Sequence, residues 1–278
     1  MQGLMDFLTT KLPLGQGVAW IVDWMTETFT VQFRTFSDHL EGMIKGMESG
    51  MLYLHPLLLI AILTLIAGGI RRSIKTGVFC LLGFLLLLNL GLWEEMVATL
   101  ALILTSTFIS LLLGVPVGIL NARSRTLFII TRPILDFMQT IPPFVYLIPA
   151  LMFFGIGEVP GVISTVVFAM PPAIRLTCLG MQQIPNELIE AGKAFGLNTW
   201  QMLFKIELPS AFPSIMMGVN QTIMMALSMV VIAALIGAGG LGAAVMRSLA
   251  TVDIGLGFES GLGIVILAML LDRIVRPE

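Results

Sequence analysis

Charged residues are scarce in this sequence. Only 12% of its 278 residues are Asp, Glu, Lys or Arg, whereas about a quarter of the residues of a soluble domain are charged. Hydrophobic residues make up 57% of the chain, and its mean hydropathy is +0.98. So few charges cannot cover the surface of a soluble domain, and that class is excluded. The composition predicts a polytopic membrane protein, which we expect to be all-α.

Cysteine, histidine and catalytic motifs are also scarce. Cys80 and Cys178 lie far apart within apolar segments, which indicates free buried thiols and disfavours a disulfide or a metal role. His39 and His55 are isolated, so we expect no metal site. The sequence shows no G-x-S-x-G or H-E-x-x-H motif, and we expect no catalytic residues. It has no basic, aromatic-studded segment that would indicate a nucleic-acid partner.

A nucleotide-binding loop is missing as well. The only Gly-Lys pair is Gly192-Lys193. Glu187 stands where the first glycine of a P-loop would be, and Ala194 stands where Ser or Thr is required. The chain therefore cannot hydrolyse ATP through a P-loop, and we expect it to bind no cofactor.

Apolar segments follow one another along most of the chain. Each is close to the ~20 residues that a bilayer-spanning helix requires. Seven spans are predicted, at residues 51–69, 76–93, 96–120, 134–155, 159–180, 213–236 and 258–275. Pro116 is expected to kink the third of them, and Pro142-Pro143 to break or bend the fourth. A short outer helix is expected at 241–250, between the last two spans.

Residues 1–50 differ from the spans that follow. Aromatic residues such as Trp24 and Phe33 alternate there with charged ones such as Asp23 and Arg34. This pattern is typical of an amphipathic segment that lies in the membrane interface. A solvent-exposed helical tail is the alternative interpretation.

The positive charges indicate the orientation. If the C-terminus and the loop Glu187–Pro213 are cytoplasmic, eleven of the fifteen Lys and Arg residues lie inside. The four outside are Lys11, Arg34, Lys45 and Arg247. An excess of Lys and Arg in cytoplasmic loops is the usual bias of membrane proteins. Seven spans then place the N-terminus outside.

The loop Glu187–Pro213 lies between two spans yet contains helical patterns. Asn186 is a candidate N-cap for a short helix that Gly196 ends in a left-handed conformation. Asn198 can cap a second helix, Thr199–Leu208, which we expect Pro209 to end. From the local pattern alone, this could be a helical hairpin that rests on the membrane surface.

Several residues in this loop match a known signature. Glu190-Ala191-Gly192, Gly196 and Ile206-Glu207-Leu208-Pro209 resemble the "EAA…G………I.LP" pattern of permease subunits of ATP-binding-cassette (ABC) importers. Gly192 departs from the pattern by replacing its second alanine with another small residue. The chain resembles type I importers, and within them the glycine betaine, proline betaine and choline group. Supporting stretches are 135–142, 144–150, 168–175 and 226–234.

The resemblance implies an architecture and a set of partners. It implies an amphipathic segment at 1–50, two accessory helices at 51–93, and a permease core at 94–278 with five membrane helices and a coupling loop at 184–213. It also implies a homodimer in the cytoplasmic membrane of a bacterium, two cytoplasmic ATPase subunits that bind ATP and Mg²⁺, and an outer substrate-binding protein. Because the chain stops at Pro277-Glu278, directly after the last predicted span, we expect that binding protein to be a separate chain.

The resemblance also implies roles for individual residues. The first short helix would be the coupling helix, which docks into a groove of the ATPase. The residues implied in coupling are Glu187, Glu190, Ala191, Gly192, Gly196, Leu208 and Pro209. The transported solute would be glycine betaine or a related quaternary ammonium compound. Choline or carnitine, taken up as a nutrient, is the alternative within the class.

Candidates for the translocation path are Tyr146, Phe144, Met225 and Met229. The methionines equally fit core packing, since Met is a flexible filler. A quaternary ammonium group is bound selectively by aromatic rings, and the spans contain few Tyr or Trp residues. We therefore expect recognition in the binding protein and a low-affinity path in this chain.

Charged and small residues within the spans allow further interpretations of their roles. Asp136 is expected to pair with Arg132 one turn away, and Glu94, Glu95 and Asp272 are expected to be solvated at span ends. The Gly114–Gly118 spacing fits close helix packing or a gating role. A secondary transporter would be expected to carry midplane ionisable groups, and a channel or membrane enzyme a filter or catalytic motif. The sequence shows none of these.

Overall fold

The computed structural model describes residues 13–71 and 73–275, and every regular element in these ranges is helical. The membrane-length and flanking helices are α2 (Leu14–Tyr53), α3 (Pro56–Arg71), α4 (Ile74–Asn89), α5 (Trp93–Arg123), α6 (Arg125–Thr140), α7 (Pro143–Phe154), α8 (Glu158–Gln182), α11 (Leu208–Ala233) and α13 (Ile254–Val275). The shorter elements are α9 (Asn186–Ala194), α10 (Thr199–Met202), a π-helical turn (Leu203–Glu207), a 3₁₀ turn (Ala234–Ile236) and α12 (Gly240–Thr251).

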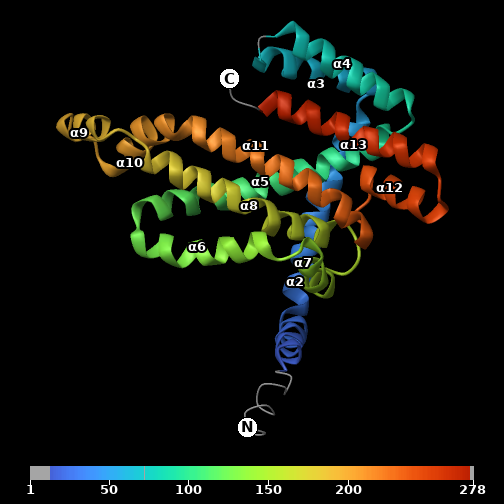
Figure 1. Ribbon diagram of the computed structural model, residues 1–278, viewed down its shortest axis with the longest axis horizontal. Coiled ribbons are helices and arrows are strands. Elements are labelled where there is room, and N and C mark those ends of the chain that lie inside the picture. The colour runs from blue at the N-terminus through green and yellow to red at the C-terminus, as the bar shows by residue number, and fades with distance from the viewer. Residues whose placement is uncertain (1–12, 72, 276–278) are drawn as a thin grey trace, which may run out of the picture.

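The centre of the molecule is a layer in which α8 packs against both α5 and α11 (Figure 1). Glycines permit the close approach. A Cβ added at Gly118 of α5 would lie 2.7 Å from the Ile174 carbonyl oxygen of α8, and one at Gly180 of α8 would lie 2.7 Å from Cβ of Ser214 on α11. Small residues at helix contacts are typical of membrane bundles, where apolar burial alone does not drive helices together. The Gly114–Gly118 spacing therefore serves packing in this structure.

The predicted spans agree only in part with the observed helices. Four continuous helical runs are long and apolar enough to cross a membrane, namely α5, α8, α13 and the run Thr199–Ile236. Two bent pairs raise the number to at most six in the described ranges. The remaining predicted span, 76–93, corresponds to α4, an apolar helix of 16 residues that is about 24 Å long, shorter than the ~30 Å hydrocarbon layer.

Both bent pairs have a proline at the break. The fourth predicted span is broken into α6 and α7, which meet at 96°, as Pro142-Pro143 predicted. The first predicted span is α3 with the last turn of α2 before it, and the two helices meet at 104° just before Pro56. By contrast, α5 continues through Pro116, where a kink was expected.

Helix α2 is a 40-residue helix that crosses the bundle and extends beyond it (Figure 1). Its middle part is anchored, since Leu40 and Ile44 are buried and Phe33 stacks on Phe153 of α7 at a centroid distance of 4.8 Å. Its first half exposes Trp20 and Trp24. The bend of 104° between α2 and α3 and the exposed aromatic residues are compatible with an interfacial segment, and the assignment of residues 1–50 to the membrane interface stays a prediction.

The loops at the two ends of the bundle differ in structure. Helices α9 and α10 project from one end, whereas α12 covers the other (Figure 1). Helix α12 agrees with the short outer helix predicted at 241–250. Left-handed glycines at positions 237, 239 and 240 permit the sharp turn that leads into it. Lys11, Arg72, Arg276 and Pro277-Glu278, used above for orientation and chain end, lie outside the described residues.

Candidate coupling site

The first helix of the projecting loop, α9, begins one residue earlier than predicted. Pro185 occupies the N-cap position, and Asn186 is already helical, so the predicted Asn186 cap is wrong. The preceding proline accounts for the shift, because its fixed φ and extended ψ give the non-helical conformation that an N-cap needs. Glu187 lies in the first turn, where the helix dipole favours negative charge.

The end of α9 is a Schellman motif, which confirms the predicted stop at Gly196. This glycine has a φ of +73°, and its N–H donates to the Lys193 carbonyl at 2.9 Å. The N–H of Leu197 donates to the Gly192 carbonyl at 3.1 Å. Both bonds satisfy helix-end carbonyls and fix the direction in which the chain leaves α9.

Gly192 is the point at which α9 rests on the second helix of the loop. It is the buried residue of α9, and an added Cβ would lie 2.7 Å from Ile206 Cδ1 and from Met202 Cε. Its position therefore needs a small side chain, as the signature requires. Because both neighbouring atoms are the ends of flexible side chains, the structure explains why glycine fits here while alanine is tolerated after a small shift.

The second helix of the loop does not end where the sequence predicts. Asn198 and Gln201 form a reciprocal capping box, which confirms the predicted cap. The helix then widens into the π-helical turn, in which the Leu208 N–H donates to the Leu203 carbonyl, and continues as α11 through Pro209. A proline ring clashes with the carbonyl four residues before it. The wider turn just before Pro209 relieves that clash, so the proline bends the chain without ending the helix.

An ion pair ties this loop to the core. Arg123, the last residue of α5, donates to Glu207 in the π-helical turn at 2.6 Å. Glu207 belongs to the Ile206–Pro209 part of the signature, and its side chain is mostly buried. A chain of contacts therefore leads from α9 through Gly192 to the π-helical turn and from there to α5.

The outward surface of the loop is both acidic and apolar. Glu187, Glu190 and Ala191 are exposed on α9. Next to them Phe195 is 86% exposed and Trp200 is 69% exposed. Trp200 also stacks on Phe204 at 6.0 Å. Exposed aromatic rings are enriched at protein–protein interfaces, so the rings of Phe195 and Trp200 make this end of the bundle a candidate docking surface.

The candidate path residues do not form one group. Tyr146 is half-buried, and its hydroxyl donates to the Met138 carbonyl, which links α7 to α6 across their break. Phe144 is exposed on α7. Met229 is fully buried in the core and Met225 packs against that core. The burial of both methionines agrees with the packing interpretation, and their role in the translocation path stays a prediction.

The partner predicted for Asp136 is also wrong. Asp136 of α6 pairs with Arg175 of α8, with Arg175 Nη2 2.6 Å from Asp136 Oδ1. The prediction used the nearest basic residue on the same helix, Arg132. It could not show that α8 runs alongside α6 and brings Arg175 closer.

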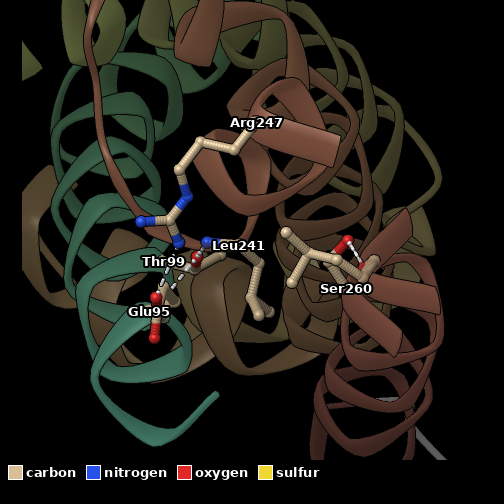
Figure 2. Close-up of polar contacts among 6 residues, drawn as sticks. Glu95, Thr99, Leu241, Arg247 and Ser260 are labelled. Carbon is tan, nitrogen blue, oxygen red and sulfur yellow. Dashed lines mark hydrogen bonds and ion pairs between the residues drawn. The ribbon is translucent and has the colours of Figure 1, made fainter. Parts of the chain in front are cut away.

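At the end of the bundle that α12 covers, two polar contacts join α12 to the start of α5, and Figure 2 shows both. Arg247 donates to Glu95 at 2.9 Å, and the Leu241 N–H donates to Thr99 Oγ1 at 2.8 Å. Glu95 was expected to be solvated, and Thr99 was not singled out. Near the inner end, Asp272 likewise accepts a hydrogen bond from Asn220 at 3.0 Å. No local sequence pattern indicates these contacts, since each joins residues more than fifty positions apart.

A bundle of apolar helices, four of them long enough to cross a membrane and with a helical loop projecting from one end, is the architecture of a multi-pass membrane protein. Comparison with known proteins agrees. The chain is 48% identical to the glycine betaine transport system permease protein OpuAB of Bacillus subtilis, over 96% of this chain and 94% of that relative. It is 45% identical to the glycine betaine/proline betaine transport system permease protein ProW of Escherichia coli, over 97% and 76% respectively.

Solved structures resemble about two thirds of the chain. A structure of the MetNI methionine ABC transporter in an inward-facing conformation matches with a TM-score of 0.61 and 26% identity, over 66% of this chain and 94% of that one. The family model described as "Binding-protein-dependent transport system inner membrane component" matches residues 110–276. The chain belongs to this family. It is thus a membrane permease subunit of an ABC transporter and not an enzyme, with ATP hydrolysis carried by a separate subunit.

Proposed function

We propose that this chain forms the membrane path of an ATP-driven importer for glycine betaine or a related quaternary ammonium solute. The observation that carries the proposal is the 48% identity to a glycine betaine permease over nearly the whole of both chains. Two further relatives widen the range of solutes. One is a glycine betaine/carnitine permease of Listeria monocytogenes that is 44% identical over 95% of this chain, and another is a trimethylamine N-oxide permease of Pelagibacter ubique. All of these named solutes carry a fully substituted nitrogen. The relatives therefore support this class of solute more strongly than any one compound within it.

The proposed assembly has two copies of this chain, two cytoplasmic ATPase subunits that bind ATP and Mg²⁺, and an outer substrate-binding protein. The surface of α9 supports the ATPase contact, because it is rigid, exposed and of mixed acidic and apolar character. In this proposal Glu187, Glu190 and Ala191 face the ATPase, Gly192 and Gly196 set the position of α9, and Leu208 and Pro209 connect it to α11.

The proposed orientation places α9 in the cytoplasm and α12 outside. The excess of Lys and Arg residues on the side of the α9 loop supports this orientation. The position of α9 and α12 at opposite ends of the bundle supports it as well (Figure 1). The N-terminus is then outside and the C-terminus is cytoplasmic. Such a protein resides in the cytoplasmic membrane of a bacterium.

Reconstitution tests this function. We expect liposomes that contain the permease, its ATPase and its binding protein to accumulate labelled glycine betaine when ATP is supplied on the ATPase side. Omission of the ATPase, the binding protein or ATP should each abolish accumulation. Uptake by the permease alone, driven by a Na⁺ or H⁺ gradient, would contradict the proposal. ATP-driven uptake of carnitine with no uptake of glycine betaine would reassign the solute.

A further inference from the structure

Two opposite charges lie inside the spans predicted at 134–155 and 159–180 and remain accessible. Asp136 stands eleven positions after the start of α6, and Arg175 stands seven positions before the end of α8. At 1.5 Å per residue, they lie roughly 16 Å and 10 Å from the inner ends of their helices. Their ion pair has a length of 2.6 Å, yet the side chains are 54% and 42% exposed in the single chain.

Exposed charge at this depth restricts what can surround it. Ionisable groups in contact with lipid chains are costly, and they usually face a water-filled cavity or a protein neighbour. Beside the pair, between α5, α6 and α8, lies a cavity of about 280 Å³. Its polar lining comes from Asn121, Arg132, Arg175 and Gln182. Asn121 is buried there and accepts a hydrogen bond from Thr131 at 3.1 Å.

We propose that the Asp136–Arg175 pair is a low-affinity station for a zwitterion inside the translocation path. This proposal rests on the function proposed above. In it, the Arg175 guanidinium binds the carboxylate of the solute, while the Asp136 carboxylate faces its quaternary ammonium group. A quaternary ammonium has no N–H to donate, so Asp136 attracts it by charge alone, whereas Arg175 can donate hydrogen bonds to the solute's carboxylate.

The exposure of the pair is what suits it to this role. An ion pair accessible to water contributes little stability, so the pair can separate and exchange partners with a solute that brings both charges. The exchange keeps every charge compensated. A cation without a carboxylate, such as choline, would instead leave the guanidinium uncompensated beside it. The station should therefore favour glycine betaine or carnitine over choline.

A cysteine-protection experiment tests the station on the permease–ATPase complex in lipid nanodiscs. Cys80 and Cys178 are both buried and are replaced by alanine to remove background. Leu179→Cys places a reporter at an exposed position in the lining of the same cavity. We expect a water-soluble thiosulfonate reagent to modify this cysteine, and millimolar glycine betaine to slow the modification more strongly than equimolar choline.

Two matched variants identify the group responsible. Arg175→Gln should weaken the protection by glycine betaine about tenfold, the size expected when one charge-assisted contact is lost. Arg125→Gln removes the same charge from the first residue of α6, an exposed position outside the lining of the cavity, and should leave the protection unchanged. The proposal is overturned if the reagent does not modify the cysteine of the Leu179→Cys variant, or if glycine betaine does not slow the modification. It is also overturned if glycine betaine protects this cysteine equally well when Arg175→Gln is present.

The same experiment separates this station from the proposed function. Uptake of glycine betaine without protection would leave the function intact and remove the station. Protection by glycine betaine in a complex that does not take it up would leave the station and remove the proposed solute. If the pair instead only holds α6 to α8, a different result is expected. Arg175→Gln would then lower the thermal stability of the complex, and glycine betaine would protect the cysteine better than choline by the same factor as before. That outcome would also overturn the station.

Discussion

Replacement of Glu190 by lysine should uncouple transport from ATP hydrolysis. Glu190 is exposed on α9 and lies on the same outward surface as Ala191. If this surface docks on the ATPase, charge reversal places a cation where the groove receives a carboxylate, and like-charge contacts at an interface cost several kcal/mol. We expect the rate of ATP-driven uptake to fall at least about tenfold. The fold should persist, because the exposed Glu190 side chain forms no hydrogen bond or ion pair within the described residues, and the ends of α9 are fixed by Pro185 and Gly196.

The measurement compares uptake, ATP hydrolysis and complex recovery in reconstituted liposomes. Purified Glu190→Lys permease should insert and retain wild-type thermal stability, while its ATPase partner no longer responds to the loaded binding protein. Glu27→Lys on α2 is the matched control, since Glu27 is exposed and the substitution changes charge by the same amount on another surface. Uptake by Glu190→Lys at the wild-type rate would show that the role proposed for Glu190 is wrong.

Replacement of Gly118 by alanine should destabilise the bundle. The added Cβ would lie 2.7 Å from the carbonyl oxygen of Ile174 and 2.7 Å from Cβ of Thr177. Neither atom is the free end of a flexible side chain, so α5 and α8 must separate. Overpacking of this kind costs about 1–3 kcal/mol, and we expect the unfolding temperature of the purified permease to fall by roughly 3–10 °C.

Gly261→Ala on α13 is the control for this prediction. An added Cβ at Gly261 meets no atom within 4 Å, and alanine is the better helix former by about 1 kcal/mol. Its unfolding temperature should therefore stay the same or rise slightly. Equal unfolding temperatures for the two variants would contradict the close contact of α5 with α8.

Local signals allowed the correct prediction of several features of the loop. The cap at Asn198 and the stop at Gly196 each depend on residues within a few positions, so the sequence carries the whole interaction. The predicted cap at Asn186 and the predicted end at Pro209 failed for a related reason. In the first, Pro185 itself adopts the non-helical N-cap conformation. In the second, the π-helical turn before Pro209 lets the helix continue through the proline.

Features that depend on tertiary structure were missed. The partner of Asp136 could not be found from spacing, because Arg175 lies 39 positions away on another helix. The contacts of Thr99 and Glu95 with α12 cross more than 140 positions. The buried position of Met229 was likewise open, since a methionine-rich apolar helix does not reveal which of its faces packs inside. The apolar pattern indicated the helices, whereas the pairing of charges needed their arrangement in space.

Site-directed cross-linking tests most directly whether α9 is the element that meets the ATPase. With Cys80 and Cys178 replaced, a photoreactive group is attached to Ala191→Cys on α9 or, as the control, to Leu249→Cys on α12. Both positions are exposed, and α12 lies at the opposite end of the bundle. After illumination of the assembled transporter, we expect a permease–ATPase adduct from Ala191→Cys alone. An adduct from Leu249→Cys, or none from Ala191→Cys in a complex that hydrolyses ATP and transports, would contradict the assignment of α9 as the coupling helix.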